Sequence, residues 1–161
     1  MALFGLSINT KDVKGFFSDK DGWNKVVSDL ETVIADSRNK FPNLDQFLIG
    51  HSMGSWIALS AVAKGLNIKG LILSGSSKVP TLVIKIQKIL ANIQIILFGK
   101  KSISNLLNFL TIKTYNKSFT PNRTESDWIS ADESNVDDYI NDPLCGFQVT
   151  NLLWLDLAKG L

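Results

Sequence analysis

Cysteine and histidine are nearly absent from this sequence of 161 residues. Cys145 is the single cysteine, so no disulfide can form within the chain. A reducing, cytoplasmic location is therefore expected. His51 is the single histidine, which leaves few options for a general base. We expect neither a metal site nor a cofactor.

An excess of charge of either sign is also lacking. The chain has 17 basic and 15 acidic residues, interspersed along its length, and a formal net charge of +2. No basic block with interleaved aromatic residues is present, which argues against nucleic-acid binding. The first six residues are mildly apolar but carry no basic residue, so they do not resemble a signal peptide.

A long uninterrupted apolar run is missing as well. The most apolar stretch, residues 82–98, contains Lys85, Gln87, Lys88, Asn92 and Gln94. These side chains would be costly at the centre of a bilayer, so we expect no transmembrane segment. The spacing favours an amphipathic helix whose apolar face is formed by Val83, Ile86, Leu90, Ile93 and Leu97.

What the chain does have is a strand–helix–strand pattern between residues 46 and 74. Apolar runs at 46–50 and 71–73 predict short buried strands, and helical spacing over 53–64 predicts the helix between them, with Gly65 as its C-cap. This βαβ unit implies parallel strands covered by helices, hence an α/β fold. A further helix is expected from Asp19 or Asp21 until Phe41-Pro42. After residue 74 only helices are expected, at 81–98, 103–112, 134–140 and 147–161.

The turn between the first strand and the helix has the pattern Gly50-x-Ser52-x-Gly54. An apolar strand leads into it and a helix leads out, which is the context that a nucleophile elbow requires. Flanking glycines leave room for a sharp turn that holds the serine in a strained backbone conformation. Ser52 is thus the candidate nucleophile, and the backbone N–H of Met53 is the candidate oxyanion donor.

Four segments carry a family resemblance. The elbow Gly-His-Ser-Met-Gly-Ser at residues 50–55 resembles that of monoacylglycerol lipases and bacterial lysophospholipase-like α/β-hydrolases, the serine aminopeptidase S33-type family. Residues 15–23 resemble the stretch that opens the preceding helix in the bacterial members. Residues 119–129 and 139–147 resemble their cap region and its closing segment. The resemblance covers residues 15–161.

This resemblance implies an α/β-hydrolase core with an inserted helical cap. It assigns residues 1–77 to a partial core that carries the elbow, 78–146 to the cap and 147–161 to the return to the core. The apolar cap helices within 81–112 would shape an acyl-chain channel. The implied reaction is acyl transfer from a small lipid ester to Ser52, followed by hydrolysis of the acyl-enzyme. Transient contact with a membrane surface is compatible with these apolar helices.

The rest of a catalytic triad is not evident. Adjacent strand residues point to opposite faces, so His51 should face away from the Ser52 hydroxyl and pack beneath the elbow. In such enzymes the triad acid and base follow the cap, and this chain has no histidine there. The acidic cap residues are expected on a solvated face, with Asp142 in a turn before Pro143: Asp132, Glu133, Asp137, Asp138 and Asp142. Asp156 is expected to be exposed and Cys145 to be a small buried residue.

The region before residue 15 also lacks the expected His-Gly loop that would supply a second oxyanion donor. We therefore expect an internal piece of a longer hydrolase, an incomplete α/β-hydrolase fold that is inactive by itself. Two other functions remain open. One is a non-catalytic module that binds apolar ligands or a partner through residues 81–112. The other is an S33-type peptidase, because an elbow alone does not separate ester from amide substrates.

Overall fold

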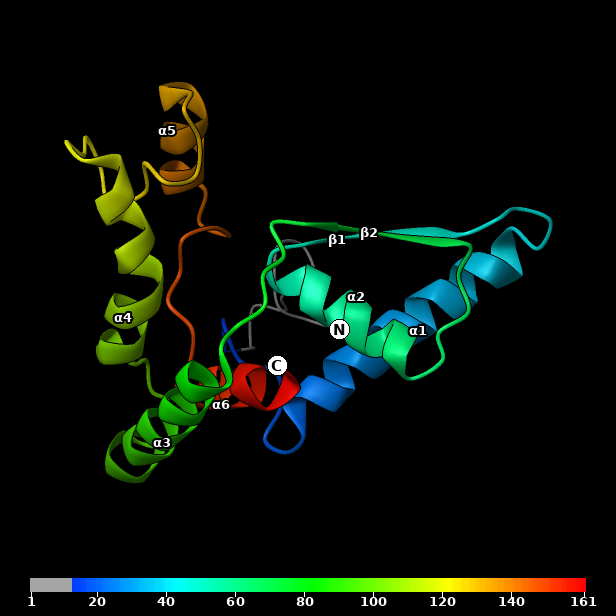
Figure 1. The fold of residues 1–161 in the computed structure, drawn as a ribbon, viewed down its shortest axis with the longest axis horizontal. Helices are drawn as coiled ribbons and strands as arrows, with labels where there is room; N and C mark the ends of the chain where they lie inside the picture. Colours follow the sequence, from blue (N-terminus) through cyan, green and yellow to red (C-terminus); the bar gives the residue numbers. More distant parts are fainter. Residues whose placement is uncertain (1–12) are drawn as a thin grey trace. The chain divides into compact units, whose positions relative to one another are not determined.

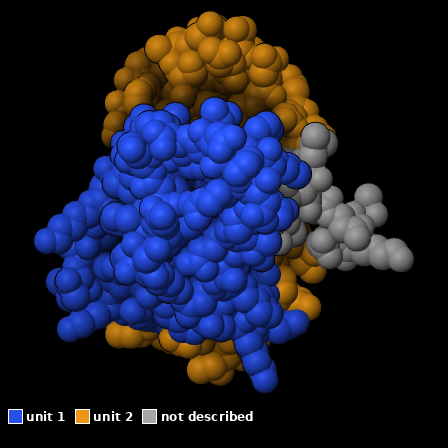
Figure 2. Space-filling view, turned by 90° about the vertical axis from the view of Figure 1, so that its right-hand side faces the viewer, with its two compact units in different colours: residues 1, 17–88, 155–161 blue, residues 2–16, 89–154 orange. Residues whose placement is uncertain are grey.

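The computed structural model describes residues 13–161, and Figure 1 shows the order of the elements along the chain. The expectation for residues 1–6 lies outside the described residues. The chain forms two compact units (Figure 2). Unit 1 contains Phe17–Lys88 and Leu155–Leu161, and unit 2 contains Ile89–Trp154 together with the described part of Ala2–Phe16.

Unit 1 begins with helix α1, Gly22–Lys40. Asp21 occupies the N-cap position, but its carboxylate accepts from the Asn24 side chain at 2.7 Å rather than from a backbone N–H. The helix ends where Phe41-Pro42 breaks the apolar repeat, as the sequence predicts. Its buried face carries Trp23, Val27 and Ile34. The predicted helix is therefore confirmed.

The βαβ unit follows. Strand β1 (Phe47–His51), helix α2 (Met53–Ala63) and strand β2 (Gly70–Ser74) succeed one another along the chain. The two strands pair in parallel, from Phe47 opposite Gly70 to His51 opposite Ser74. α2 lies along one side of this sheet in Figure 1. The chain leaves α2 through Gly65, whose φ of +100° is readily available only to glycine. The predicted order of strand, helix and strand is confirmed, but the expected burial of the strands is wrong: only Gly50 of β1 is buried, and no residue of β2 is.

The core of unit 1 lies between helices. Ile57, Ala58 and Ala61 of α2 are buried, and the Trp23 Nε1–H of α1 donates to the Ser60 hydroxyl at 3.3 Å. The last turn of α6 (Asn151–Gly160) also packs on α1. A Cβ on Gly160 would lie 2.0 Å from the Trp23 ring. This close approach explains why the position requires glycine.

Unit 2 contains α4 (Asn105–Asn116), a short 3₁₀ turn η2 (Lys117–Phe119) and α5 (Glu133–Asn141). Asn116 organises the loop between them: its amide donates to the Thr124 carbonyl and accepts from the Trp128 N–H. Asp127 accepts from the backbone and hydroxyl of Thr124, and these bonds lower the pKa of its carboxyl. The polar segment that the sequence marks as a turn region is thus tied down by its own side chains.

The sequence expectation for the final helix is wrong at its start. The pattern predicted a helix over 147–161, whereas α6 begins only at Asn151. Thr150 forms an isolated antiparallel bridge with Ile103, and its N–H and hydroxyl donate to the Gly15 carbonyl at 2.9 and 2.8 Å. These long-range bonds hold the preceding residues extended. Apart from that bridge, no strand follows Ser74 in the part of the chain that the structure describes.

Helix α3, Thr81–Phe98, has the predicted bounds but little packing. Only Ala91 is buried, while Ile89, Ile96, Leu97 and Phe98 are 60–82% exposed. The predicted apolar face is likewise uncovered at Val83, Ile86 and Ile93, each more than 40% exposed. By length and composition α3 is the one helix among the described residues that could cross a membrane, which is weak evidence by itself. The predicted apolar face of α3 is therefore formed, but residues 13–161 leave most of it exposed.

Candidate active site

Ser52 lies at the junction of β1 and α2, with φ 51° and ψ −123°. Positive φ is uncommon for a residue with a side chain, costs about 1–3 kcal/mol and persists only where neighbours fix it. Among the described residues only Asp21 and Ser52 combine a side chain with positive φ. Ser52 is also exposed, at the carboxyl end of the strand and the N-terminus of the helix. The backbone of the predicted elbow is therefore strained where the sequence placed it.

Hydrogen bonds on both sides of Ser52 fix its backbone in this conformation. The Ser52 N–H donates to the Ser74 carbonyl at 2.9 Å, which joins the elbow to the end of β2. The Ser52 carbonyl accepts from the N–H and hydroxyl of Ser55, at 2.9 and 2.6 Å, and Ser55 is fully buried. Sequence reasoning missed Ser55 and Ser74 as positioning residues. The small residue after Gly54 was a signal for Ser55, but the Ser74 contact depends on strand pairing.

The two glycines of the pattern have different roles. A Cβ on Gly50 would lie 2.6 Å from the Gly54 carbonyl oxygen and 2.8 Å from the Ser55 Cα, so β1 and α2 can meet only over glycine. A Cβ on Gly54 meets nothing within 4 Å. Gly75, at φ +56°, brings the loop after β2 against the His51 ring. Gly50, not Gly54, is the glycine that the described packing requires.

Met53 is the first residue of α2, and its N–H is one of the helix donors without an intrahelical acceptor. Nothing between residues 13 and 161 accepts a hydrogen bond from it. The positive end of the α2 dipole adds to the potential at this N–H. An oxyanion formed next to Ser52 could therefore be stabilised here.

His51 occupies the last position of β1. Its Nδ1 lies 3.1 Å from the Ser74 hydroxyl, and the residue is exposed. The expectation that it packs beneath the elbow is therefore wrong, because the Ser74 hydroxyl and the Gly75 loop hold it at the rim of the sheet. Within the described range the structure gives Ser52 no hydrogen-bonded base.

The acidic residues between Asp132 and Asp142 form local interactions. Asp142 accepts from the Leu144 N–H at 2.7 Å, so it forms the turn that the sequence predicts before Pro143. Asp132 caps α5 through the Ser134 N–H. Arg123 pairs with Asp137 at 2.7 Å and with Glu133 at 3.8 Å. Residues 13–161 hold no cluster of three or more His, Cys, Asp or Glu that could bind a metal ion.

Two expected environments are wrong. Asp156 is 2% exposed rather than solvated, since the face of α6 that carries it packs against Gly22 at the start of α1. Burial raises the pKa of Asp156, Lys159 at 3.9 Å lowers it in part, and Asp21 raises it further. Cys145 is only half-buried, with its Sγ 3.6 Å from the Asp142 carboxylate. Partial burial and this carboxylate raise the pKa of the thiol, which disfavours a nucleophilic thiolate.

A crevice of about 420 Å³ lies in unit 1 between α2 and the segment after β2. Trp56 lines it and donates to the Ser77 carbonyl at 2.9 Å. Ser52 is not among its lining residues. The elbow therefore opens to solvent in unit 1 rather than into this crevice.

Solved structures of other proteins share this fold. A highly thermostable carboxyl esterase from Bacillus coagulans, in complex with glycerol, aligns over 86% of this chain with 24% identity and a TM-score of 0.75. A monoacylglycerol lipase from Paleococcus ferrophilus aligns over 98% of it with 17% identity and a TM-score of 0.57. The alignments cover 45% and 51% of those proteins, so this chain spans about half their length. The two parallel strands and their flanking helices are thus part of an α/β-hydrolase fold.

Curated proteins gave no match to this chain. The model of one family, described as "Serine aminopeptidase, S33", matches residues 5–161. That match includes the turn at Ser52, both strands and the helices after Ser74. The chain therefore belongs to the serine aminopeptidase S33 family of α/β-hydrolases.

Proposed function

We propose that this chain is the nucleophile-bearing part of a serine hydrolase that cleaves carboxylic esters of lipids, of the lysophospholipase or monoacylglycerol lipase type. The observation that carries the proposal is Ser52, held at φ 51° between β1 and α2 with the Met53 N–H unengaged beside it. Two proteins with this fold, a carboxyl esterase and a monoacylglycerol lipase, favour ester over peptide substrates for this chain.

In the proposed reaction the Ser52 oxygen attacks the ester carbonyl and the hydroxyl proton leaves to a base. The carbonyl oxygen becomes an oxyanion that the Met53 N–H stabilises, and its collapse expels the alcohol, which takes up a proton. Water then cleaves the acyl-enzyme by the same sequence of steps and releases the fatty acid. This chain supplies the nucleophile and one donor, whereas the triad acid and base would come from outside it.

The proposal divides the chain into a partial core over residues 1–77, a helical cap over 78–146 and the return to the core over 147–161. Exposed apolar residues of α3 suit an acyl-chain channel or transient contact with a membrane surface. The low cysteine content supports a cytoplasmic location as part of this proposal.

The most direct test supplies the triad acid and base from another protein. A chimaera would join it to the part of the Bacillus coagulans esterase that the alignment leaves uncovered. We expect the chimaera to hydrolyse p-nitrophenyl butyrate and the isolated chain to show no turnover above background. Ser52→Ala in the chimaera should lower kcat by about 10³-fold or more. Ser76→Ala, at an exposed serine in the loop after β2, is the matched control and should leave kcat unchanged. Activity that survives Ser52→Ala would contradict the proposal.

The peptidase alternative is favoured by the description of the family, serine aminopeptidase S33. The same chimaera separates the two substrates, because both need the same nucleophile. We expect a larger kcat/KM for p-nitrophenyl butyrate than for leucine p-nitroanilide. The reverse order would assign the chain to the peptidases.

A non-catalytic module that binds apolar ligands is favoured by α3, where only Ala91 is buried. This function predicts saturable binding of a fatty acid to the isolated chain and no Ser52-dependent activity in the chimaera. Ile96→Ser, at an exposed position of α3, should then weaken the binding. The hydrolase proposal instead expects the chimaera to be active.

A further inference from the structure

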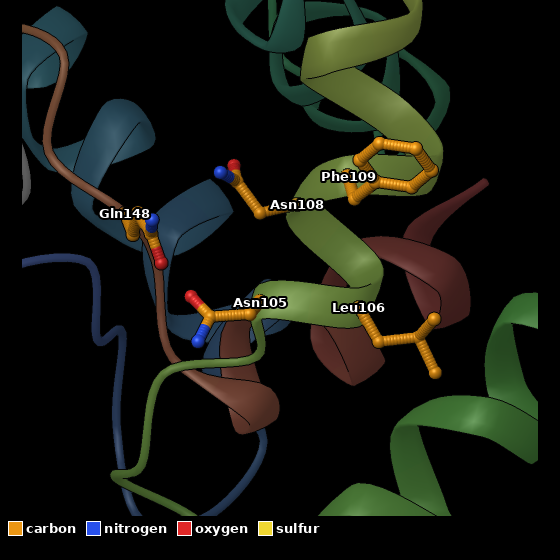
Figure 3. A pocket seen from close by; sticks show the side chains of 5 residues that line it. All are labelled: Asn105, Leu106, Asn108, Phe109 and Gln148. Atoms are coloured by element: carbon orange, nitrogen blue, oxygen red, sulfur yellow. The ribbon is translucent and has the colours of Figure 1, made fainter.

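The His51 imidazole and the Ser74 hydroxyl meet at the carboxyl end of the β1–β2 sheet, in unit 1. The proposed acyl transfer uses neither of these side chains. The shallow crevice of about 380 Å³ in unit 2 offers no comparable pair (Figure 3), since its lining holds no base and no nucleophile: Asn105, Leu106, Asn108, Phe109 and Gln148. The contact between His51 and Ser74 therefore requires an explanation of its own.

His51 holds the end of β2 through two contacts. Its Nδ1 lies 3.1 Å from the Ser74 hydroxyl, directly across the pair of strands. A hydroxyl group both donates and accepts, so this bond forms with either tautomer of the imidazole. The ring also touches the loop after β2, because a Cβ on Gly75 would lie only 3.1 Å from the His51 Cε1. The imidazole therefore fixes both the last residue of β2 and the first residue of the loop.

Ser74 in turn holds Ser52. The Ser74 carbonyl accepts from the Ser52 N–H at 2.9 Å, one residue beyond the end of β1. In the described residues this bond closes a sheet of only two strands, and the ends of hydrogen-bonded elements open most readily. The positive φ of Ser52 persists only where neighbours fix it. A side chain that keeps the end of β2 in place therefore also stabilises the strained backbone of the nucleophile.

We infer that His51 is a positioning residue: its imidazole holds Ser74, and through the Ser74 carbonyl it fixes the backbone of Ser52. The inference rests on the proposed function, because it assigns His51 a role toward the same nucleophile. It does not make His51 the base, since the described contact of its ring is with the Ser74 hydroxyl. The opposite case, an exposed side chain without effect on the elbow, predicts that loss of the imidazole leaves the Ser52 N–H unchanged.

The test uses the full chain, labelled with nitrogen-15, and measures hydrogen exchange of the Ser52 N–H by NMR. We expect His51→Ala to speed this exchange about fivefold, which corresponds to the net loss of one hydrogen bond. The Lys69 N–H donates to the Gln46 carbonyl at 2.8 Å, at the other end of the same sheet, and should exchange as before. The comparison separates a local effect on the elbow from a general loss of stability.

Further variants separate the hydrogen bond from the bulk of the ring. His51→Asn puts a polar carboxamide atom near the position of Nδ1 and should restore slow exchange at Ser52, whereas His51→Leu should not. Ser74→Ala removes the other partner and should speed the exchange by the same factor, with no further increase when it is combined with His51→Ala. Ser76→Ala, two residues farther along the loop, is the matched control and should leave the exchange unchanged.

In an active chimaera with the esterase, His51→Ala should lower kcat for p-nitrophenyl butyrate about fivefold and leave KM unchanged, and His51→Asn should restore kcat. The inference is overturned if His51→Ala leaves exchange at Ser52 or kcat unchanged, if Lys69 exchanges faster by the same factor, or if His51→Asn and His51→Leu behave alike. The exchange results do not depend on activity. They are therefore distinct from a failure of the proposed function, which would appear as activity that survives Ser52→Ala.

Discussion

The two faces of the β1–β2 sheet differ sharply. On the face toward α2, Gly50 meets the helix backbone so closely that no side chain fits. On the opposite face Phe47, Ile49 and Ile72 are 65%, 67% and 54% exposed. Since parallel strands in α/β proteins are normally covered on both faces, this apolar face is suited to a cover that residues 13–161 do not supply. The positions of apolar residues in the sequence thus indicate which surfaces can be buried. Packing within the chain decides which of these surfaces are buried.

The largest expected effect is that of Gly50→Ala, on the covered face. The new Cβ would lie 2.6 Å from the Gly54 carbonyl oxygen, so the first turn of α2 must move away from β1. We expect the free energy of unfolding to fall by about 2–3 kcal/mol, in the upper range for overpacking. Urea denaturation measures the change. A loss below about 0.5 kcal/mol would show that β1 and α2 are not held in the described contact.

A smaller effect is expected at Asp156, whose carboxylate is buried within unit 1. Burial raises its pKa in the folded state above the unfolded value, so the charged form costs stability at neutral pH. As pH falls through the raised pKa, the folded state takes up the proton first and that cost is relieved. Asp156→Asn should therefore raise the Tm at pH 7, and this gain should shrink as the pH is lowered.

The control for the Asp156 experiment is Asp137→Asn on α5, where the carboxylate is half-exposed and paired with Arg123. Its Tm difference should not favour the variant at any pH. A gain for Asp156→Asn that grows toward acid pH would contradict the described burial of Asp156.

Next in size is Gly54→Ala, the counterpart of Gly50→Ala within one motif. A Cβ at this position meets nothing within 4 Å, and alanine favours a helix over glycine by about 1 kcal/mol. We expect the isolated chain to be stabilised by up to about 1 kcal/mol in the same urea titration. Destabilisation would mean that something outside the described packing occupies the space beside Gly54.

The smallest effect is expected on the open face. Ile49→Val should change the free energy of unfolding by less than about 0.5 kcal/mol, because Ile49 is 67% exposed. Ile57→Val in α2, where the side chain is 9% exposed, should cost about 1 kcal/mol. A loss at Ile49 that equals the loss at Ile57 and grows with protein concentration would show that the open face is covered by a second copy.

Much of the fold could be predicted from the sequence, since most elements carry a local signal. The apolar repeat and the Phe41-Pro42 stop gave the end of α1, and Gly65 gave the end of α2. The start of α6 could not be predicted in this way. It depends on Thr150, which bonds Gly15 and Ile103 from far along the chain. Local periodicity does not contain contacts of that range.

The residues of the candidate site likewise include some with a local sequence signal and some without one. Ser52 and Met53 follow from a short pattern between a strand and a helix, so they could be predicted. Ser74 could not, because its bond to the Ser52 N–H depends on the register of β1 and β2. The burial of Asp156 could not be predicted either, since the sequence pattern does not show that this face of α6 packs against Gly22.

The most direct test of the central claim, that Ser52 is the nucleophile of an elbow, is to locate a covalent adduct. The chimaera with the uncovered part of the esterase would be treated with a fluorophosphonate, which phosphonylates activated serines, and digested for mass spectrometry. We expect one adduct, on the Ser52 peptide, and its loss in Ser52→Ala. An adduct on another residue, or a folded chimaera that is not labelled, would contradict the claim.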